Sequence, residues 1–108
     1  MSPITTHVLD VSLGRPAAGV PVVLESGGKE LGRGVTDADG RLKSLLSDAP
    51  LAAGVYRLTF DTAAYFKSRK TESFYPSVAV TFEVRKPGEH YHVPLLLSPF
   101  GYSTYRGS

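Results

Sequence analysis

The chain contains no cysteine. This absence excludes disulfides, thiolate metal ligands and a cysteine nucleophile, so packing alone must stabilise the core. Long hydrophobic runs are missing too, because no stretch approaches the roughly 20 apolar residues that a membrane span needs. Residues 1–7 (MSPITTH) also lack the basic region and apolar run of a secretory signal. We therefore expect a soluble, cytoplasmic protein that does not enter a membrane.

The sequence has little clustering of charge: only residues 67–70 (KSRK) form a basic cluster. The chain has 12 lysines and arginines against 10 acidic residues, which gives a net charge of +2. A nucleic-acid-binding surface is expected to carry a stripe or patch of basic residues. We predict no nucleic-acid partner and interpret residues 67–70 as a solvated loop.

The chain is of ordinary globular composition, with 108 residues of which 42% are apolar and 20% charged. It therefore predicts a single domain, residues 1–108. A domain of this size buries one core but cannot enclose a deep active-site cavity. An active site on this chain could therefore require a second subunit.

Short β-branched runs alternate with turn signals about every ten residues, the spacing typical of a β-sandwich. Residues 61–67 form the one plausible helix, because Asp61 can cap its first turn. Residues 37–40 (DADG) predict a tight turn that fixes the position of Arg41. The pattern predicts an all-β, antiparallel sandwich with one short helix and seven to eight strands, at residues 5–11, 20–25, 30–36, 55–60, 77–84, 90–97 and 101–107.

Three histidines are the main candidates for chemistry, and two of them, His90 and His92, share one face of a predicted strand. With His7 they match a catalytic three-histidine zinc site in number only. Hydrolysis without a metal needs a base and a donor for the developing oxyanion, which a histidine and Arg41 or Arg106 can supply. A histidine with a purely structural hydrogen bond is the alternative interpretation. We predict no metal site.

Two other catalytic arrangements lack their motifs. Ser98, Ser103 and Ser108 lie near histidines in the sequence, but no Gly-X-Ser-X-Gly elbow is present. The glycines at residues 27–28 and 32–34 fall in a predicted hairpin rather than before a helix, which argues against a phosphate-binding loop.

Four segments resemble the 5-hydroxyisourate hydrolases, a family of transthyretin-like enzymes: residues 7–10 (HVLD), 37–41 (DADGR), 90–99 (HYHVPLLLSP) and 102–108 (YSTYRGS). The resemblance covers nearly the whole chain. Transthyretin, the hormone carrier of the same superfamily, shares the LLSP and YST elements but lacks the histidines, the mid-chain arginine and the closing YRGS. The motifs therefore match the enzymes better than the carrier.

The resemblance implies a transthyretin-like (prealbumin-like) sandwich that assembles as a homotetramer. It also implies hydrolysis of 5-hydroxyisourate with water in urate degradation, giving 2-oxo-4-hydroxy-4-carboxy-5-ureidoimidazoline, with no cofactor. The implied catalytic residues are His7, Arg41, His92 and Ser108. The implied substrate contacts are His7, Arg41, Tyr105 and Arg106, with His90 in support.

Two alternatives remain from the sequence. A non-catalytic, transthyretin-like carrier would use the same fold to bind a small molecule. A generic sandwich module is the other, because residues 19–22 and 35–40 also resemble carboxypeptidase-regulatory-like and adhesion domains. Those domains lack the histidines and the closing YRGS.

Overall fold

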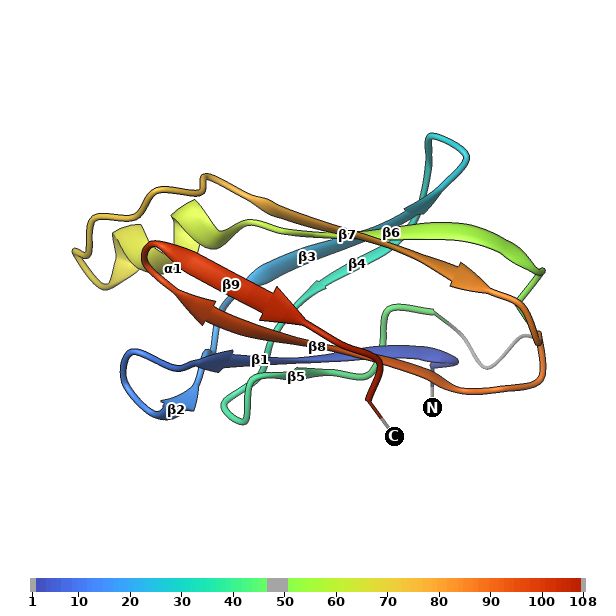
Figure 1. The fold of residues 1–108 in the computed structure, drawn as a ribbon, viewed down its shortest axis with the longest axis horizontal. Coiled ribbons are helices and arrows are strands. Elements are labelled where there is room, and N and C mark those ends of the chain that lie inside the picture. The colour runs from blue at the N-terminus through green and yellow to red at the C-terminus, as the bar shows by residue number, and fades with distance from the viewer. Residues whose placement is uncertain (1, 47–50, 108) are drawn as a thin grey trace.

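The structure is a computed structural model that describes residues 2–46 and 51–107. Two sheets stack face to face, and one short helix lies at one end of the sandwich (Figure 1). Sheet A contains β1 (Ile4–Asp10), β2 (Arg15–Pro16), β5 (Arg41–Leu42), β8 (Tyr91–Ser98) and β9 (Gly101–Thr104). Sheet B contains β3 (Pro21–Ser26), β4 (Lys29–Val35), β6 (Gly54–Phe60) and β7 (Val78–Val84). The helix, α1, spans Thr62–Ser68.

The order of the strands places β1 and β8 at the centre of sheet A. That sheet runs β2-β1-β8-β9, and β5 also pairs with β1. Sheet B runs β4-β3-β6-β7. The β-sandwich predicted from the sequence is confirmed, and β2 and β5, of two residues each, raise the count within the described residues from the predicted seven or eight strands to nine.

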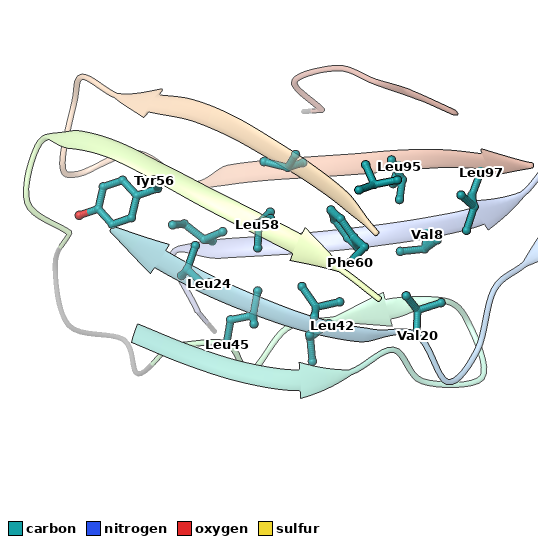
Figure 2. Close-up of a cluster of buried hydrophobic side chains, with 14 of the residues drawn as sticks. Val8, Val20, Leu24, Leu42, Leu45, Tyr56, Leu58, Phe60, Leu95 and Leu97 are labelled. Atoms are coloured by element: carbon teal, nitrogen blue, oxygen red, sulfur yellow. The ribbon is translucent and has the colours of Figure 1, made fainter. Parts of the chain in front are cut away.

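The core lies between the sheets (Figure 2). Its residues come from both layers, as alternating side chains on facing strands require. In β1, Thr6, Val8 and Asp10 are buried, whereas His7 and Leu9 on the opposite face are only half-buried. The labelled core residues in Figure 2 are Val8, Val20, Leu24, Leu42, Leu45, Tyr56, Leu58, Phe60, Leu95 and Leu97.

Turn and cap residues act as the sequence predicts. Gly27 and Gly28 both adopt positive φ, at 60° and 79°, and close the hairpin between β3 and β4. Asp61 caps α1 by accepting a hydrogen bond from the backbone N–H of Ala64 at 3.0 Å. Local chemistry therefore sets these two boundaries.

One strand pair differs from the antiparallel arrangement that we predicted. β1 and β8 run parallel, in register from Ile4 opposite Tyr91 to Asp10 opposite Leu97. Strands joined by short turns must run antiparallel, and the prediction extended that rule to the whole sandwich. β1 and β8 are instead connected through most of the chain, which permits either direction, so the prediction was wrong for this pair.

The last strand is shorter than predicted. β9 ends at Thr104 rather than near residue 107, and Tyr105 and Arg106 leave the sheet. Gly107 then returns to form an isolated antiparallel bridge with His92. The Arg106 side chain contacts Glu89 and Tyr91. Within the described part of the chain, no helix is long and apolar enough to cross a membrane.

Candidate active site

Three strands of sheet A bring the predicted site residues onto its outer face. β5 pairs with β1 so that Arg41 lies opposite His7, and β8 pairs with β1 so that His92 lies opposite Thr5. Paired residues project to the same side of a sheet, and the neighbours Thr6 and Leu42 are buried on the inner side. His7, Arg41 and His92 therefore share one face, although up to 85 positions separate them in the sequence, the interval from His7 to His92.

The turn before Arg41 holds this residue in position. The Asp37 carboxylate accepts hydrogen bonds from the backbone N–H groups of Arg41 at 3.0 Å and Asp39 at 2.9 Å. The bond from Arg41 is the main reason why the pKa of Asp37 lies below its ordinary value. Gly40 has a φ of 74°, and a side chain there would collide with the carbonyl oxygen of Val8. The predicted turn is confirmed.

His7 has one ring nitrogen engaged and one available. Its Nε2 lies 2.9 Å from the carbonyl oxygen of Asp39. A carbonyl can only accept, so Nε2 carries the proton and donates. The Nδ1 of a neutral His7 is then an acceptor that can face a substrate donor.

Thr5 contacts both His90 and His92, and the sequence did not indicate it as a site residue. The Thr5 hydroxyl lies 2.8 Å from Nδ1 of His92 and 3.0 Å from Nε2 of His90. The two rings stack with centroids 6.3 Å apart. Thr5 shares the outer face of its strand with His7, which is visible in the sequence, but a threonine in a strand carries no chemical signal of its own.

The environment of His92 favours the neutral form of its ring. Burial lowers its pKa below the ordinary histidine value, and the neighbouring charges of His90, His7 and Arg41 lower it further. A neutral imidazole beside a permanently charged guanidinium can accept a proton from water while the arginine binds an oxygen that becomes negative. A base and an oxyanion donor are the two groups that hydrolysis of a carbonyl compound requires.

Gly107 packs directly against His92. Its backbone N–H donates to the carbonyl oxygen of His92 at 2.8 Å. A Cβ at this position would lie 2.7 Å from Cδ2 of the His92 ring and 3.2 Å from Cγ of Pro94. The position admits only glycine while His92 keeps its place, because carbon atoms in contact are about 3.5–4.0 Å apart.

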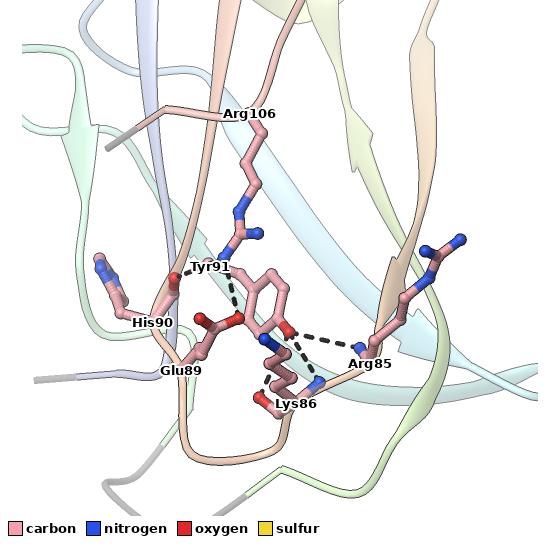
Figure 3. A network of polar contacts seen from close by, with 6 residues as sticks. All are labelled: Arg85, Lys86, Glu89, His90, Tyr91 and Arg106. Atoms are coloured by element: carbon pink, nitrogen blue, oxygen red, sulfur yellow. Dashed lines mark hydrogen bonds and ion pairs between the residues drawn. The ribbon is translucent and has the colours of Figure 1, made fainter.

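Arg106 does not join the outer face within this single chain. Its guanidinium lies 4.5 Å from the ring centroid of Tyr91 and 3.5 Å from the Glu89 carboxylate (Figure 3). Tyr91 is buried and belongs to the inner side of β8. Tyr105 is 56% exposed. Together with Tyr91 and Arg106 it lines a groove that runs between the C-terminal segment and β7. Ser108 lies outside the described residues.

No metal site is apparent in residues 2–46 and 51–107. There, no group of three or more histidine, cysteine, aspartate or glutamate side chains is placed to hold a metal ion. His90 and His92 are instead both hydrogen-bonded to Thr5. The outer face thus presents organic acid–base groups.

The chain is similar in sequence to known proteins over nearly its whole length. The HIUase/Transthyretin family matches residues 4–107. The 5-hydroxyisourate hydrolase of Salmonella dublin is 50% identical over 97% of this chain and 80% of its own length. That of Mus musculus is 47% identical over 99% of this chain and 96% of its own.

Solved structures agree with the sequence comparison. The 5-hydroxyisourate hydrolase of Klebsiella pneumoniae has a TM-score of 0.88 and 45% identity, covering 97% of this chain and 98% of its own. Transthyretin from Sparus aurata has a TM-score of 0.90 but 34% identity, covering 99% and 97%. The fold is thus common to both proteins, and the resemblance seen in the sequence motifs is confirmed. The chain belongs to the HIUase/transthyretin family.

Proposed function

We propose that this chain hydrolyses 5-hydroxyisourate in urate degradation, with water as the only co-substrate and no cofactor. The observation that carries the proposal is the common outer face of His7, Arg41 and His92 on three adjoining strands. The 50% identity to a Salmonella hydrolase, against 34% to a fish transthyretin, supports an enzyme rather than a carrier.

In the proposed reaction, His92 is the general base. Its lowered pKa favours the neutral ring, whose Nε2 takes a proton from water as the water oxygen bonds to a ring carbonyl carbon of the substrate. Arg41 binds the carbonyl oxygen and stabilises its negative charge. The carbon–nitrogen bond then breaks, and His92 returns the proton to the leaving nitrogen. The six-membered ring opens to 2-oxo-4-hydroxy-4-carboxy-5-ureidoimidazoline.

His7 orients the substrate under this proposal. The hydrogen bond from its Nε2 to Asp39 fixes the ring, so that the opposite nitrogen can accept from a donor group of the substrate. His7 also lies opposite Arg41, which places an acceptor and a donor side by side. Such a pair suits a planar substrate that alternates carbonyl oxygens and N–H groups.

The active enzyme under this proposal is a homotetramer in which the C-terminal segment serves a neighbouring copy. Two observations support an assembly: the last strand, β9, is at the edge of its sheet, and its residues from Tyr102 to Thr104 are exposed. The Arg106 guanidinium lies over Tyr91, and Tyr105 lines the groove beside β7, so under this proposal both residues bind substrate in the site of another chain. Ser108 would complete that site through its hydroxyl.

The direct test of the activity generates 5-hydroxyisourate with urate oxidase and follows its ultraviolet absorbance. We expect this chain to accelerate the decay well beyond the spontaneous rate. Decay at the background rate would contradict the proposal and favour a carrier. Replacing Arg41 with Gln should lower kcat by about 100- to 1,000-fold, as removal of one oxyanion donor does, without changing the oligomer measured by sedimentation.

A mixing experiment tests the shared site. Arg41→Gln and Arg106→Ala should each be nearly inactive alone, and both variants keep Gly107 against His92. Co-expressed, they should regain activity, because some sites of a mixed tetramer combine an intact Arg41 with an intact C-terminal segment. No recovery from tetramers that contain both chains would contradict the shared site while leaving the hydrolase activity intact.

A further inference from the structure

The Thr5 hydroxyl, on β1, lies between the imidazole rings of His90 and His92. Thr5 is only 3% exposed although it belongs to the outer face of sheet A, because the histidine side chains cover it. Its oxygen contacts Nδ1 of His92 at 2.8 Å and Nε2 of His90 at 3.0 Å. Both distances are those of good hydrogen bonds.

The number of protons restricts how these bonds can form. A threonine hydroxyl has one proton, and each of the two contacts needs one proton between its heavy atoms. Thr5 can therefore donate to only one histidine, and the other must donate to Thr5. If both histidines donated, the hydroxyl proton would have no acceptor among the described residues, at a cost of about 1–3 kcal/mol for a buried donor.

Two arrangements satisfy both contacts, and they have opposite consequences for His92. In the first, Nδ1–H of His92 donates to Thr5, and Thr5 donates to His90, which leaves Nε2 of His92 as a bare acceptor. In the second, His90 donates to Thr5, and Thr5 donates to Nδ1 of His92, so Nε2 of His92 carries a proton. Only the first arrangement gives His92 a base on the side away from Thr5.

The first arrangement also survives the reaction unchanged. When Nε2 takes a proton, His92 becomes a cation with two N–H groups, and its bond to Thr5 keeps its direction. No hydrogen bond has to reverse during proton transfer, which is the condition for a preorganised site. In the second arrangement, His92 offers the substrate no nitrogen that can accept a proton.

From this geometry we infer that Thr5 is a positioning residue that holds His92 in the Nδ1–H tautomer, with His90 as the acceptor that fixes the direction of the chain of hydrogen bonds. The inference rests on the proposed function for the role of His92 as the base. The inference also assigns a role to His90, which the family resemblance implied only as a supporting residue: it accepts the hydrogen bond from Thr5. Histidine ligands of metals are oriented in the same way by their outer partners.

The test measures the tautomer and the kinetics separately. In the full-length protein labelled with ¹⁵N, imidazole nitrogen shifts distinguish a protonated from a bare nitrogen, and a His92→Gln sample assigns the signals. We expect protonated Nδ1 and bare Nε2 in the wild type at neutral pH. Thr5→Val should lose this preference and lower kcat by roughly 10- to 100-fold, the usual effect of removing such a partner, with a smaller change in KM. Thr5→Ser should restore both.

Thr6→Val is the matched control. Thr6 is the adjacent buried threonine, but it faces the core and donates to the carbonyl oxygen of Val93 at 2.6 Å. Its loss should lower the melting temperature and leave the His92 signals and kcat unchanged. A wild-type His92 protonated at Nε2 would overturn the inference, as would Thr5→Val with wild-type signals and kcat. If Thr5→Val fails to fold, the wild-type tautomer and Thr5→Ser decide the question.

The two proposals fail in different ways. A wild-type protein with the expected tautomer but no turnover of 5-hydroxyisourate would contradict the proposed function and leave the hydrogen-bond arrangement standing. An active wild type with the opposite tautomer would contradict the role of Thr5 alone.

Discussion

Replacing Gly107 with alanine should disable the site without unfolding the protein. The new methyl group would lie 2.7 Å from Cδ2 and 3.4 Å from Cγ of the His92 ring. Carbon atoms in contact are about 3.5–4.0 Å apart, so the ring or the backbone bridge must move by about 1 Å. A misplacement of about 1 Å in a catalytic group can cost on the order of 100-fold in rate. We expect kcat to fall by about 10- to 100-fold.

Stability should change little in this variant, because Gly107 lies beyond the last strand in a terminal segment. The assay follows 5-hydroxyisourate decay at several substrate concentrations, with the spontaneous rate subtracted, alongside thermal unfolding. Gly101→Ala is the control, because a Cβ there would meet only Oγ of Ser98, at an ordinary 3.6 Å. Wild-type kcat in Gly107→Ala, with the His92 ring signals also unchanged, would refute the reasoning.

Two further predictions concern ionisation. If His92 is the base, kcat/KM should lose activity on the acid side with a midpoint below the ordinary histidine value of 6.5, because burial lowers its pKa; a midpoint at or above 6.5 would contradict this assignment. Tyr65 donates from its hydroxyl to the buried Asp10 carboxylate at 2.7 Å, and Tyr65→Phe should lower the free energy of unfolding by about 1.5–3 kcal/mol in denaturant titrations. Burial and the Asp10 contact raise the pKa of Tyr65 from 10.0 to about 12. The unfolded state therefore releases the tyrosine proton first, so wild-type stability should fall from about pH 10 to pH 12. That fall should be absent in Tyr65→Phe, and equal alkaline profiles would show that the contact contributes nothing.

Local signals in the sequence were sufficient for most of the fold. The pair Gly27 and Gly28 marked the hairpin between β3 and β4, and Asp61 marked the start of α1. Each of these features depends on neighbours along the chain. The parallel pairing of β1 with β8 depends on contacts between distant segments, and nothing in either strand specifies its partner or direction.

The candidate site could be predicted in its residue types but not in its detail. The turn signal at residues 37–40 predicted a fixed position for Arg41. The alternation of side chains along a strand predicted that His90 and His92 share one face. The two hydrogen bonds that Thr5 makes with His90 and His92 depend on the register between β1 and β8, which the sequence does not contain. The orientation of Arg106 also escaped prediction, because its partners Tyr91 and Glu89 act through tertiary contact.

The parallel pairing of β1 with β8 also determines at which stage of folding the site can form. Thr5 and His92 are register partners from opposite ends of the sequence, so the candidate base receives its hydrogen-bond partner only after the chain closes on itself. Such high contact order makes folding slow relative to a protein built from hairpins alone. A nascent chain that still lacks β8 can complete the β3–β4 hairpin, but it lacks the contact between Thr5 and His92. Recovery of activity during refolding therefore reports the joining of the two chain ends rather than the formation of secondary structure.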